Sequence, residues 1–278
     1  MKFTKMHGAG NDFLLVQGYE DRDWPALSQA MCERHLGAGA DGVILVLPSA
    51  KAAVRMRLFN ADGSEAEVSG NGVRCLVKYV VERGLAMPAD GKVTIEAIHA
   101  VLVAGVEMDG QRVRSVRLSM GPPRFEPREV PVAAEMSPPV IDLPIEVDGE
   151  RLPVTCLSMG NPHAVTFIDT PVTAYPLETI GPKVEHHAAF PARVNFGVGR
   201  LLSRDHMELR VWERGCGETL ACGSGSCAAM VAARLKGLAG DAVDITQPGG
   251  QLRVEWDGIA DVFLSGDARF VFDGDWPD

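Results

Sequence analysis

Two glycine-rich stretches each place a side chain that could do chemistry directly before a predicted helix. Ser69-Gly70-Asn71-Gly72 leads into VRCLVKYVV, and Cys222-Gly-Ser-Gly leads into SCAAMVAARL. The first N–H groups of a helix lack intrahelical partners and carry the positive end of its dipole. Such a turn suits a carboxylate and lowers the pKa of a cysteine. We therefore predict that Cys222 is partly thiolate and able to take a proton from carbon; the alternative is a buried structural thiol.

The two stretches belong to an internal repeat. Segments 69–84 and 222–237 share the plan of an Oγ or Sγ residue, Gly-x-Gly, an apolar helix and a final glycine, at an offset of 153 residues. A second pair, Gly-Asn before DFLLV and Gly-Asn before PHAVTF, recurs at an offset of 150. Two markers at nearly one offset indicate a duplicated domain whose two helix starts face each other across a cleft. The alternative is chance similarity between glycine-rich turns.

Many short strand-like runs and few helical patterns predict an α+β fold with mostly antiparallel strands. The longer helical patterns cover residues 24–35, 72–83 and 225–236. We predict two domains, residues 1–120 and 121–265, with the tail 266–278 a candidate to return to the first. The Pro-rich stretch 121–144 is the predicted connection between them. Cys75 and Cys227 lie past the helix starts and are predicted core residues.

Composition and charge exclude several classes of function. The chain has 278 residues and a formal net charge of −10. It has no basic block, so nucleic-acid binding is not expected. No apolar run approaches the ~20 residues of a membrane helix. The start MKFTKMHGAGNDF lacks the apolar core of a signal peptide, so a cytoplasmic location with reduced cysteines is expected.

Cofactor sites are not expected either. The six cysteines form no C-x-x-C pair, which argues against zinc. Residues 37–42 match G-x-G-x-x-G, but they precede the strand-like VILVL and do not open a helix. A nicotinamide or flavin site is therefore rejected.

Five motifs together resemble the diaminopimelate epimerase family: MKFTKMHGAGNDF, RHLGAGADG, FNADGSEAEVSGNG, SMGNPH and ERGCGETLACGSGSCA. The resemblance implies two pseudosymmetric domains, each a mostly antiparallel or mixed sheet or barrel around a central helix, with the active site between them. It implies an isomerase of lysine and peptidoglycan precursor synthesis, a small-molecule amino-acid substrate and a homodimer, with Phe263 at an aromatic dimer position. It also implies a reaction without pyridoxal phosphate or metal, in which one cysteine removes the α-proton and another delivers one from the opposite face.

The resemblance assigns site residues by motif position. Cys222 matches one catalytic cysteine, and His163 with Glu213 matches the pair thought to adjust the cysteine pKa values. The substrate-contact positions are Asn11, Asn60, Gly70, Asn71, Asn161, Asn195, Glu213, Arg214, Gly223 and Ser224. Amides suit both ends of a zwitterion, and an arginine can hold a carboxylate by two parallel bonds.

These assignments have structural alternatives. Asn11 and Asn71 beside glycines could be turn residues. Glu213 and Arg214 could form a surface ion pair, and His163 could be a satisfied core histidine. Gly42 stands where some family members have a glutamine that touches substrate.

Ser69 departs from the family, which has its other catalytic cysteine there. Three interpretations stay open: an inactivating replacement, natural or introduced; a slower proton relay through the hydroxyl; or altered chemistry with Cys222 as the single base, as in an isomerase or dehydratase. At the level of the whole protein, the alternatives are an epimerase of diaminopimelate or of another amino acid, and a catalytically silent relative that binds an amino acid.

Overall fold

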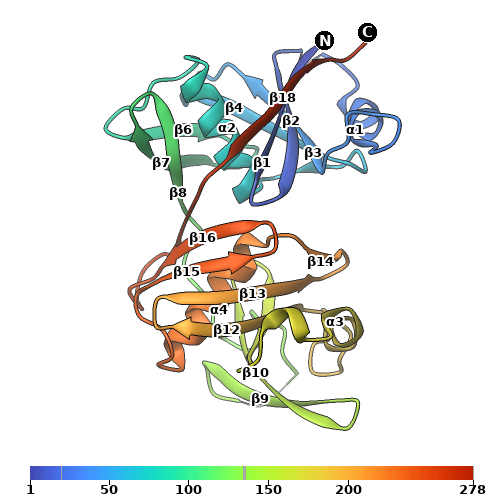
Figure 1. The fold of residues 1–278 in the computed structure, drawn as a ribbon, viewed down its shortest axis with the longest axis vertical. Coiled ribbons are helices and arrows are strands. Elements are labelled where there is room, and N and C mark those ends of the chain that lie inside the picture. Colours follow the sequence, from blue (N-terminus) through green and yellow to red (C-terminus); the bar gives the residue numbers. More distant parts are fainter. Residues whose placement is uncertain (20, 134–135, 278) are drawn as a thin grey trace. The chain divides into compact units, whose positions relative to one another are not determined.

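The computed structural model describes residues 1–19, 21–133 and 136–277. Over these residues strands predominate and helices are few, which confirms the α+β class. The chain divides into two compact units, Met1–Leu118 with Ser265–Asp278, and Ser119–Leu264 (Figure 1). In the described ranges, every helix is too short or too polar to cross a membrane.

The first unit is a ladder of paired strands in which the last strand of the chain returns to pair with the first. β1 pairs antiparallel with β2 and β18, β2 parallel with β3, and β3 antiparallel with β4. β4 then pairs parallel with β6, and β6 antiparallel with β7. The elements are β1 (Lys2–Gly8), β2 (Asn11–Gln17), α1 (Trp24–Cys32), β3 (Gly42–Leu47), β4 (Val54–Asn60), β5 (Glu65–Ala66), α2 (Gly70–Glu82), β6 (Lys92–Glu96), β7 (Val101–Asp109), β8 (Arg112–Ser119) and β18 (Arg269–Asp275).

The second unit follows the same plan. β10 pairs antiparallel with β9 and β11, β11 parallel with β12, and β12 antiparallel with β13. β13 pairs parallel with β15, and β15 antiparallel with β16. The elements are β9 (Val140–Val147), β10 (Glu150–Ser158), β11 (Pro162–Phe167), η1 (Val172–Ala174), α3 (Leu177–Glu185), β12 (Asn195–Ser203), β13 (His206–Glu213), β14 (Gly217–Thr219), α4 (Gly223–Leu235), β15 (Ala242–Gln247) and β16 (Gly250–Glu255). Strand β17 (Phe263–Gly266) begins in the second unit and ends in the first.

The two units are therefore topological repeats. β10–β16 take the places of β1–β7, and β9 takes that of β18. In each unit one helix precedes the third strand of the repeat, and a longer helix, α2 or α4, precedes the strand that runs parallel to the fourth. The repeat indicated by two glycine-rich turns thus extends through the strand order of both units.

Helices α1 and α2 cover opposite faces of β2 and β3. Phe13 and Leu15 belong to the core that contains α2, whereas Leu14 and Val16 belong to the core that contains Trp24 of α1. Both faces of these strands are buried, so their sequence is a continuous apolar run and not an alternation.

Helix α4 is buried on all sides. Its residues from Gly225 to Ala233 are inaccessible, and it contacts strands β10 to β13, β15 and β16. Its many alanines let the surrounding strands approach closely. The strands around α4 consequently hold this helix in place.

The structure differs from the sequence predictions at three places. The stretch 121–144 does not connect the units but lies in the second, where Val130 and Val140 are core residues; residues 134 and 135 lie outside the described ranges. The first predicted helix ends at Cys32, because Glu33 is extended. Helix α3 escaped prediction because Gly181 and Pro182 interrupt its pattern; a Cβ at Gly181 would lie 2.6 Å from the Trp212 ring.

Candidate active site

Cys222 is the N-cap residue of α4. Its backbone is extended (φ −122°, ψ 112°), and its Sγ accepts a hydrogen bond from the N–H of Gly225 at 3.4 Å. Glycine at position 225 allows this close packing, because a Cβ there would lie 3.0 Å from Val211 Cγ2 and 3.2 Å from Cys222 Sγ. The backbone N–H of Cys222 donates to Gln247 Oε1 at 2.9 Å, and Gln247 Nε2 donates to Ser226 Oγ at 2.8 Å. These buried hydrogen bonds fix the backbone of Cys222, from which the thiol side chain extends.

The Cys222 thiol donates to Glu213 Oε2 at 3.1 Å. The other oxygen of that carboxylate accepts from Thr219 Oγ1 at 2.5 Å, and Ser224 Oγ lies 3.6 Å from the sulfur. Glu213 therefore faces the Cys222 thiol, and not Arg214 as a surface ion pair would require. The sequence analysis assigns no role to Thr219, although it lies within the motif ERGCGETLACGSGSCA, or to Gln247, which lies outside the five motifs.

The prediction that Cys222 is partly thiolate is wrong for this structure. Burial raises the pKa of the Cys222 thiol above its ordinary value, and the negative charge of Glu213 raises it further. The hydrogen bond from the Gly225 N–H lowers it, but by less. The helix start favours an anion as expected, yet desolvation of a side chain that is 3% exposed outweighs that effect. Cys222 is a neutral thiol here.

Three predicted site residues stand side by side across the sheet of the second unit. His163 on β11 pairs with Asn195 on β12. The next residue of β12, Phe196, pairs with Trp212 on β13, and Glu213 follows Trp212, so Asn195 lies beside Glu213. Asn195 Nδ2 donates to Pro162 O at 2.8 Å, and its Oδ1 accepts from the backbone N–H of Arg214 at 2.9 Å. Asn195 therefore ties the end of β13 to β11.

His163 is buried, and its Nε2 lies 3.0 Å from Asn161 Oδ1. Burial lowers the pKa of His163 to about 3, so the imidazole is neutral near pH 7. The Arg214 guanidinium is exposed and donates to Ala192 O at 3.0 Å. Gly223 and Ser224, in the first turn of α4, are half-buried.

Ser69 occupies the corresponding cap of α2. Its backbone has nearly the same conformation as Cys222 (φ −128°, ψ 124°), and its Oγ accepts from the N–H of Gly72 at 3.2 Å. A Cβ at Gly72 would lie 3.1 Å from Ile44 Cδ1, so glycine again allows close packing on a strand. Ser69 and Gly70 are half-buried. The structure thus gives residues 69 and 222 the same local role in the two units.

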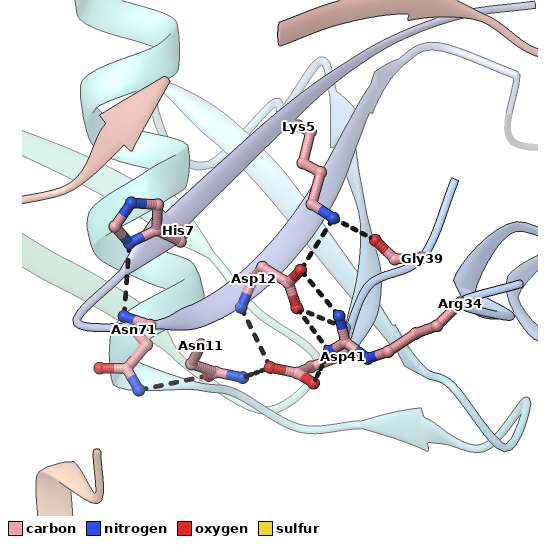
Figure 2. Close-up of polar contacts among 9 residues, drawn as sticks. Lys5, His7, Asn11, Asp12, Arg34, Gly39, Asp41 and Asn71 are labelled. Atoms are coloured by element: carbon pink, nitrogen blue, oxygen red, sulfur yellow. Dashed lines mark hydrogen bonds and ion pairs between the residues drawn. The ribbon is translucent and has the colours of Figure 1, made fainter. Parts of the chain in front are cut away.

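The predicted amides of the first unit are ordered by hydrogen bonds and are not simple turn residues. Asn11 opens β2, and its Nδ2 donates to Asp41 Oδ2 at 2.6 Å; its Oδ1 accepts from Asn71 Nδ2 at 3.2 Å (Figure 2). Asn71 lies in the first turn of α2. Asn60 ends β4, is exposed and donates to Ser64 Oγ at 3.0 Å.

The repeated scaffold carries different side chains in its two copies. His163, Asn195 and Glu213 of the second unit occupy the positions of Phe13, Gly42 and Asn60 in the first. The serine cap therefore has an amide, and not a carboxylate, at the position that corresponds to Glu213.

Two further cysteines fit a structural role. Cys75 and Cys227 are fully buried, as predicted, and burial raises the pKa of Cys75 to about 12. Within the described ranges, His, Cys, Asp and Glu side chains form no group of three or more arranged to hold a metal ion. The glycine-rich residues 37–42 lead from α1 into β3, which Gly42 begins, and do not open a helix.

Comparison with known proteins covers nearly the whole chain. The family model described as diaminopimelate epimerase matches residues 3–126 and 155–271. The diaminopimelate epimerase of Moorella thermoacetica is 47% identical over 100% of this chain and 99% of its own length, and that of Pelotomaculum thermopropionicum is 45% identical over the same shares.

Solved structures share the fold at much lower identity. A phenazine biosynthesis protein of the PhzF family from Bacillus anthracis superposes with a TM-score of 0.72 at 17% identity, over 99% of this chain and 98% of its own. A hydroxyproline epimerase from Agrobacterium vitis gives 0.69 at 16% identity, over 99% and 91%. By its match to the family model and to full-length relatives, the chain belongs to the diaminopimelate epimerase family.

Proposed function

We propose that this chain is an isomerase that interconverts LL- and meso-diaminopimelate by moving a proton at the α-carbon. Membership of the family over the full length supports the substrate. The observation that carries the chemistry is the Cys222 thiol, placed at the start of α4 and hydrogen-bonded to the Glu213 carboxylate at 3.1 Å.

The thiol–carboxylate pair explains how a neutral cysteine can act as a base. When the thiol proton moves to Glu213, the carboxylate charge disappears as the thiolate charge forms. The number of buried charges is unchanged, so the desolvation that opposes an isolated thiolate is largely avoided. The thiolate then takes the α-hydrogen as a proton and leaves the C–H electron pair on the α-carbon.

The helix starts supply groups for the substrate carboxylate. The N–H groups of Gly223 and Ser224 lie in the first turn of α4, where helix geometry leaves donors without an intrahelical acceptor. Gly70 and Asn71 hold the same positions in α2. Donors at a carboxylate stabilise the charge that develops on the adjacent carbon. The predicted roles of Asn60, Asn161, Asn195 and Arg214 at the ammonium and carboxylate groups of the other end belong to this proposal.

Ser69 is the group that we propose delivers the second proton, because it caps α2 as Cys222 caps α4. A hydroxyl is a much weaker acid than a thiol. In addition, the first unit has Asn60 at the position equivalent to Glu213, so no carboxylate stands there. We therefore expect inversion to be slower than α-proton exchange. The same asymmetry favours a second candidate, an enzyme with Cys222 as its only base.

Exchange in deuterium oxide separates these possibilities. Incorporation of deuterium with inversion supports the epimerase, and incorporation with retention supports the single-base enzyme. No incorporation into LL- or meso-diaminopimelate would refute both and leave an amino-acid-binding protein. Cys222→Ala should abolish exchange, whereas Cys156→Ala, a buried cysteine of β10, should keep it.

A homodimer and a cytoplasmic location complete the proposal. The resemblance at Phe263 and the biosynthetic role of the relatives support them. Light scattering on the purified chain tests the dimer, and fractionation of the source cells tests the location.

A further inference from the structure

Two of the family motifs build a charged cluster beside Asn11. Asp12 and Asp41 form two reciprocal hydrogen bonds: the backbone N–H of each donates to a carboxylate oxygen of the other at 3.0 Å. Arg34 Nη2 lies 3.0 Å from Asp12 Oδ1 and 2.8 Å from Asp41 Oδ1, and Lys5 Nζ lies 3.0 Å from Asp12 Oδ2 (Figure 2). Two cations thus balance two carboxylates.

The two cations keep Asp12 ionised. Burial raises the pKa of Asp12, but hydrogen bonds from Arg34 and Lys5 outweigh burial and hold that pKa below its ordinary value. Asp41 shares Arg34 with Asp12 and receives the Asn11 amide. An ionised carboxylate has no hydrogen to donate, so Asp41 can only accept from Asn11.

A buried cation marks the other end of the same chain of bonds. Arg74 of α2 is 0% exposed, and its Nη2 donates to Asn71 Oδ1 at 2.7 Å. Its Nε donates to Asp267 O at 3.3 Å, and its Nη1 is buried without a hydrogen-bond partner among the described residues. A guanidinium has no acceptor atom, so Arg74 can only donate to Asn71.

The two ends determine the orientation of both amides between them. Asp41 must face the nitrogen of Asn11, and Arg74 must face the oxygen of Asn71. Asn71 Nδ2 then donates to Asn11 Oδ1, as observed at 3.2 Å. Turning either amide would put nitrogen against guanidinium or oxygen against carboxylate. Because an amide nitrogen carries two hydrogens, one N–H of Asn11 and one of Asn71 are left over.

We propose that Asp41 and Arg74 are positioning residues that hold Asn11 and Asn71 in the one orientation in which both present an N–H to the carboxylate at the reacting carbon. This inference rests on the proposed function for the identity of the ligand. The relay itself, Asp41–Asn11–Asn71–Arg74, consists of hydrogen bonds within the protein and does not depend on the identity of the ligand.

The test begins without a ligand. In ¹⁵N-labelled protein, Asp41→Asn replaces an acceptor with a group that can donate or accept. It should shift the side-chain amide resonances of Asn71, a residue that Asp41 does not touch. Arg74→Gln should likewise shift those of Asn11. The control Asp273→Asn removes a first-unit carboxylate paired with Arg83 and should leave both unchanged. Unchanged Asn71 resonances in Asp41→Asn would overturn the relay.

Calorimetry then tests the presentation of the two N–H groups. Asp41→Asn should weaken meso-diaminopimelate binding about tenfold, the effect of one charge-assisted hydrogen bond, with kcat nearly unchanged because the contact exists before and during the reaction. Asp273→Asn should stay within about twofold. An unchanged dissociation constant in Asp41→Asn would overturn the proposal.

If the unaltered chain does not bind diaminopimelate, the proposed function fails, and acetate serves as a bare carboxylate probe. Acetate that shifts both Asn amides supports the relay as a carboxylate site, and acetate that shifts neither refutes it. Urea unfolding of each variant identifies any loss caused by unfolding.

Discussion

Glu213→Gln gives the most direct test of the thiol–carboxylate pair, because two effects of Glu213 on Cys222 act in opposite directions. The negative charge raises the pKa of the thiol. The same carboxylate, 3.1 Å from the sulfur, is the proposed acceptor of its proton. Glutamine keeps the shape and an oxygen for Thr219 but removes both the charge and the basic site.

The magnitudes follow from that distance. Two like charges 3.1 Å apart repel by about 5 kcal/mol at an effective dielectric constant of about 20, as an upper bound. Loss of the S–H···O bond to a charged oxygen, which stabilises the neutral thiol by about 1.5–3 kcal/mol, lowers the pKa further. We expect the pKa of Cys222 to fall by at least about one unit, at 1.36 kcal/mol per unit. Without a proton acceptor, α-proton exchange should fall about 100-fold.

The two quantities are measured separately. The rate at which methyl methanethiosulfonate modifies Cys222, followed by peptide mass spectrometry as a function of pH, reports the thiol pKa. Deuterium incorporation into diaminopimelate reports catalysis. Glu208→Gln, on the same strand and paired with Arg200, is the control and should change neither. If exchange rises together with thiol reactivity, Glu213 only suppresses the thiolate and the proposed proton transfer is refuted.

Three further predictions concern the same sites. Ser69→Cys should raise the epimerisation rate at least about tenfold, equal to about 1.4 kcal/mol in barrier height. Chiral chromatography of the two stereoisomers measures that rate, and no rise would mean that the residue capping α2 does not deliver a proton. Gln247→Leu leaves the buried N–H of Cys222 and the Ser226 hydroxyl without their partner. It should therefore lower the free energy of unfolding in urea by about 1–3 kcal/mol, and a loss below about 0.5 kcal/mol would contradict the buried network. His163 has a pKa of about 3 in the folded chain, below the ~6.5 of the unfolded chain. Between these two values the unfolded state binds one more proton than the folded state, so the free energy of unfolding should decline as the pH falls from about 6.5 towards 3. At pH 5 this amounts to about 2 kcal/mol, and His163→Asn should remove that part of the pH dependence of urea unfolding.

The sequence could predict the local scaffold of each half-site, because it depends on short-range rules. A cap residue followed by Gly-x-Gly and an apolar helix predicts a helix start, and both α2 and α4 begin within two residues of the predicted positions. Matching offsets predict a repeat, and the strand pairings of the two units agree with it.

The sequence could not predict the electrostatics of Cys222 or the partners that fix it. The pKa depends on how completely the thiol is buried and on a carboxylate nine residues away, and neither follows from a helix start alone. Gln247 reaches the cap from β15, and Asp41 reaches Asn11 across a sheet, through contacts that only the tertiary fold creates. Helix α3 contains a glycine and a proline that weaken its pattern, and packing on Trp212 overrides that local preference.

The duplication limits what Ser69→Cys can restore. The second unit provides its cap with a carboxylate at Glu213, whereas the corresponding residue of the first unit is Asn60. A thiol at position 69 would share the cap geometry of Cys222 without a comparable proton acceptor, so it would act more readily as an acid than as a base. Inversion that begins with proton removal by Cys222 should therefore gain more than inversion that begins at position 69. Measured primary deuterium isotope effects in the two directions should differ in this variant, and equal effects would show that the two caps are chemically equivalent despite Asn60.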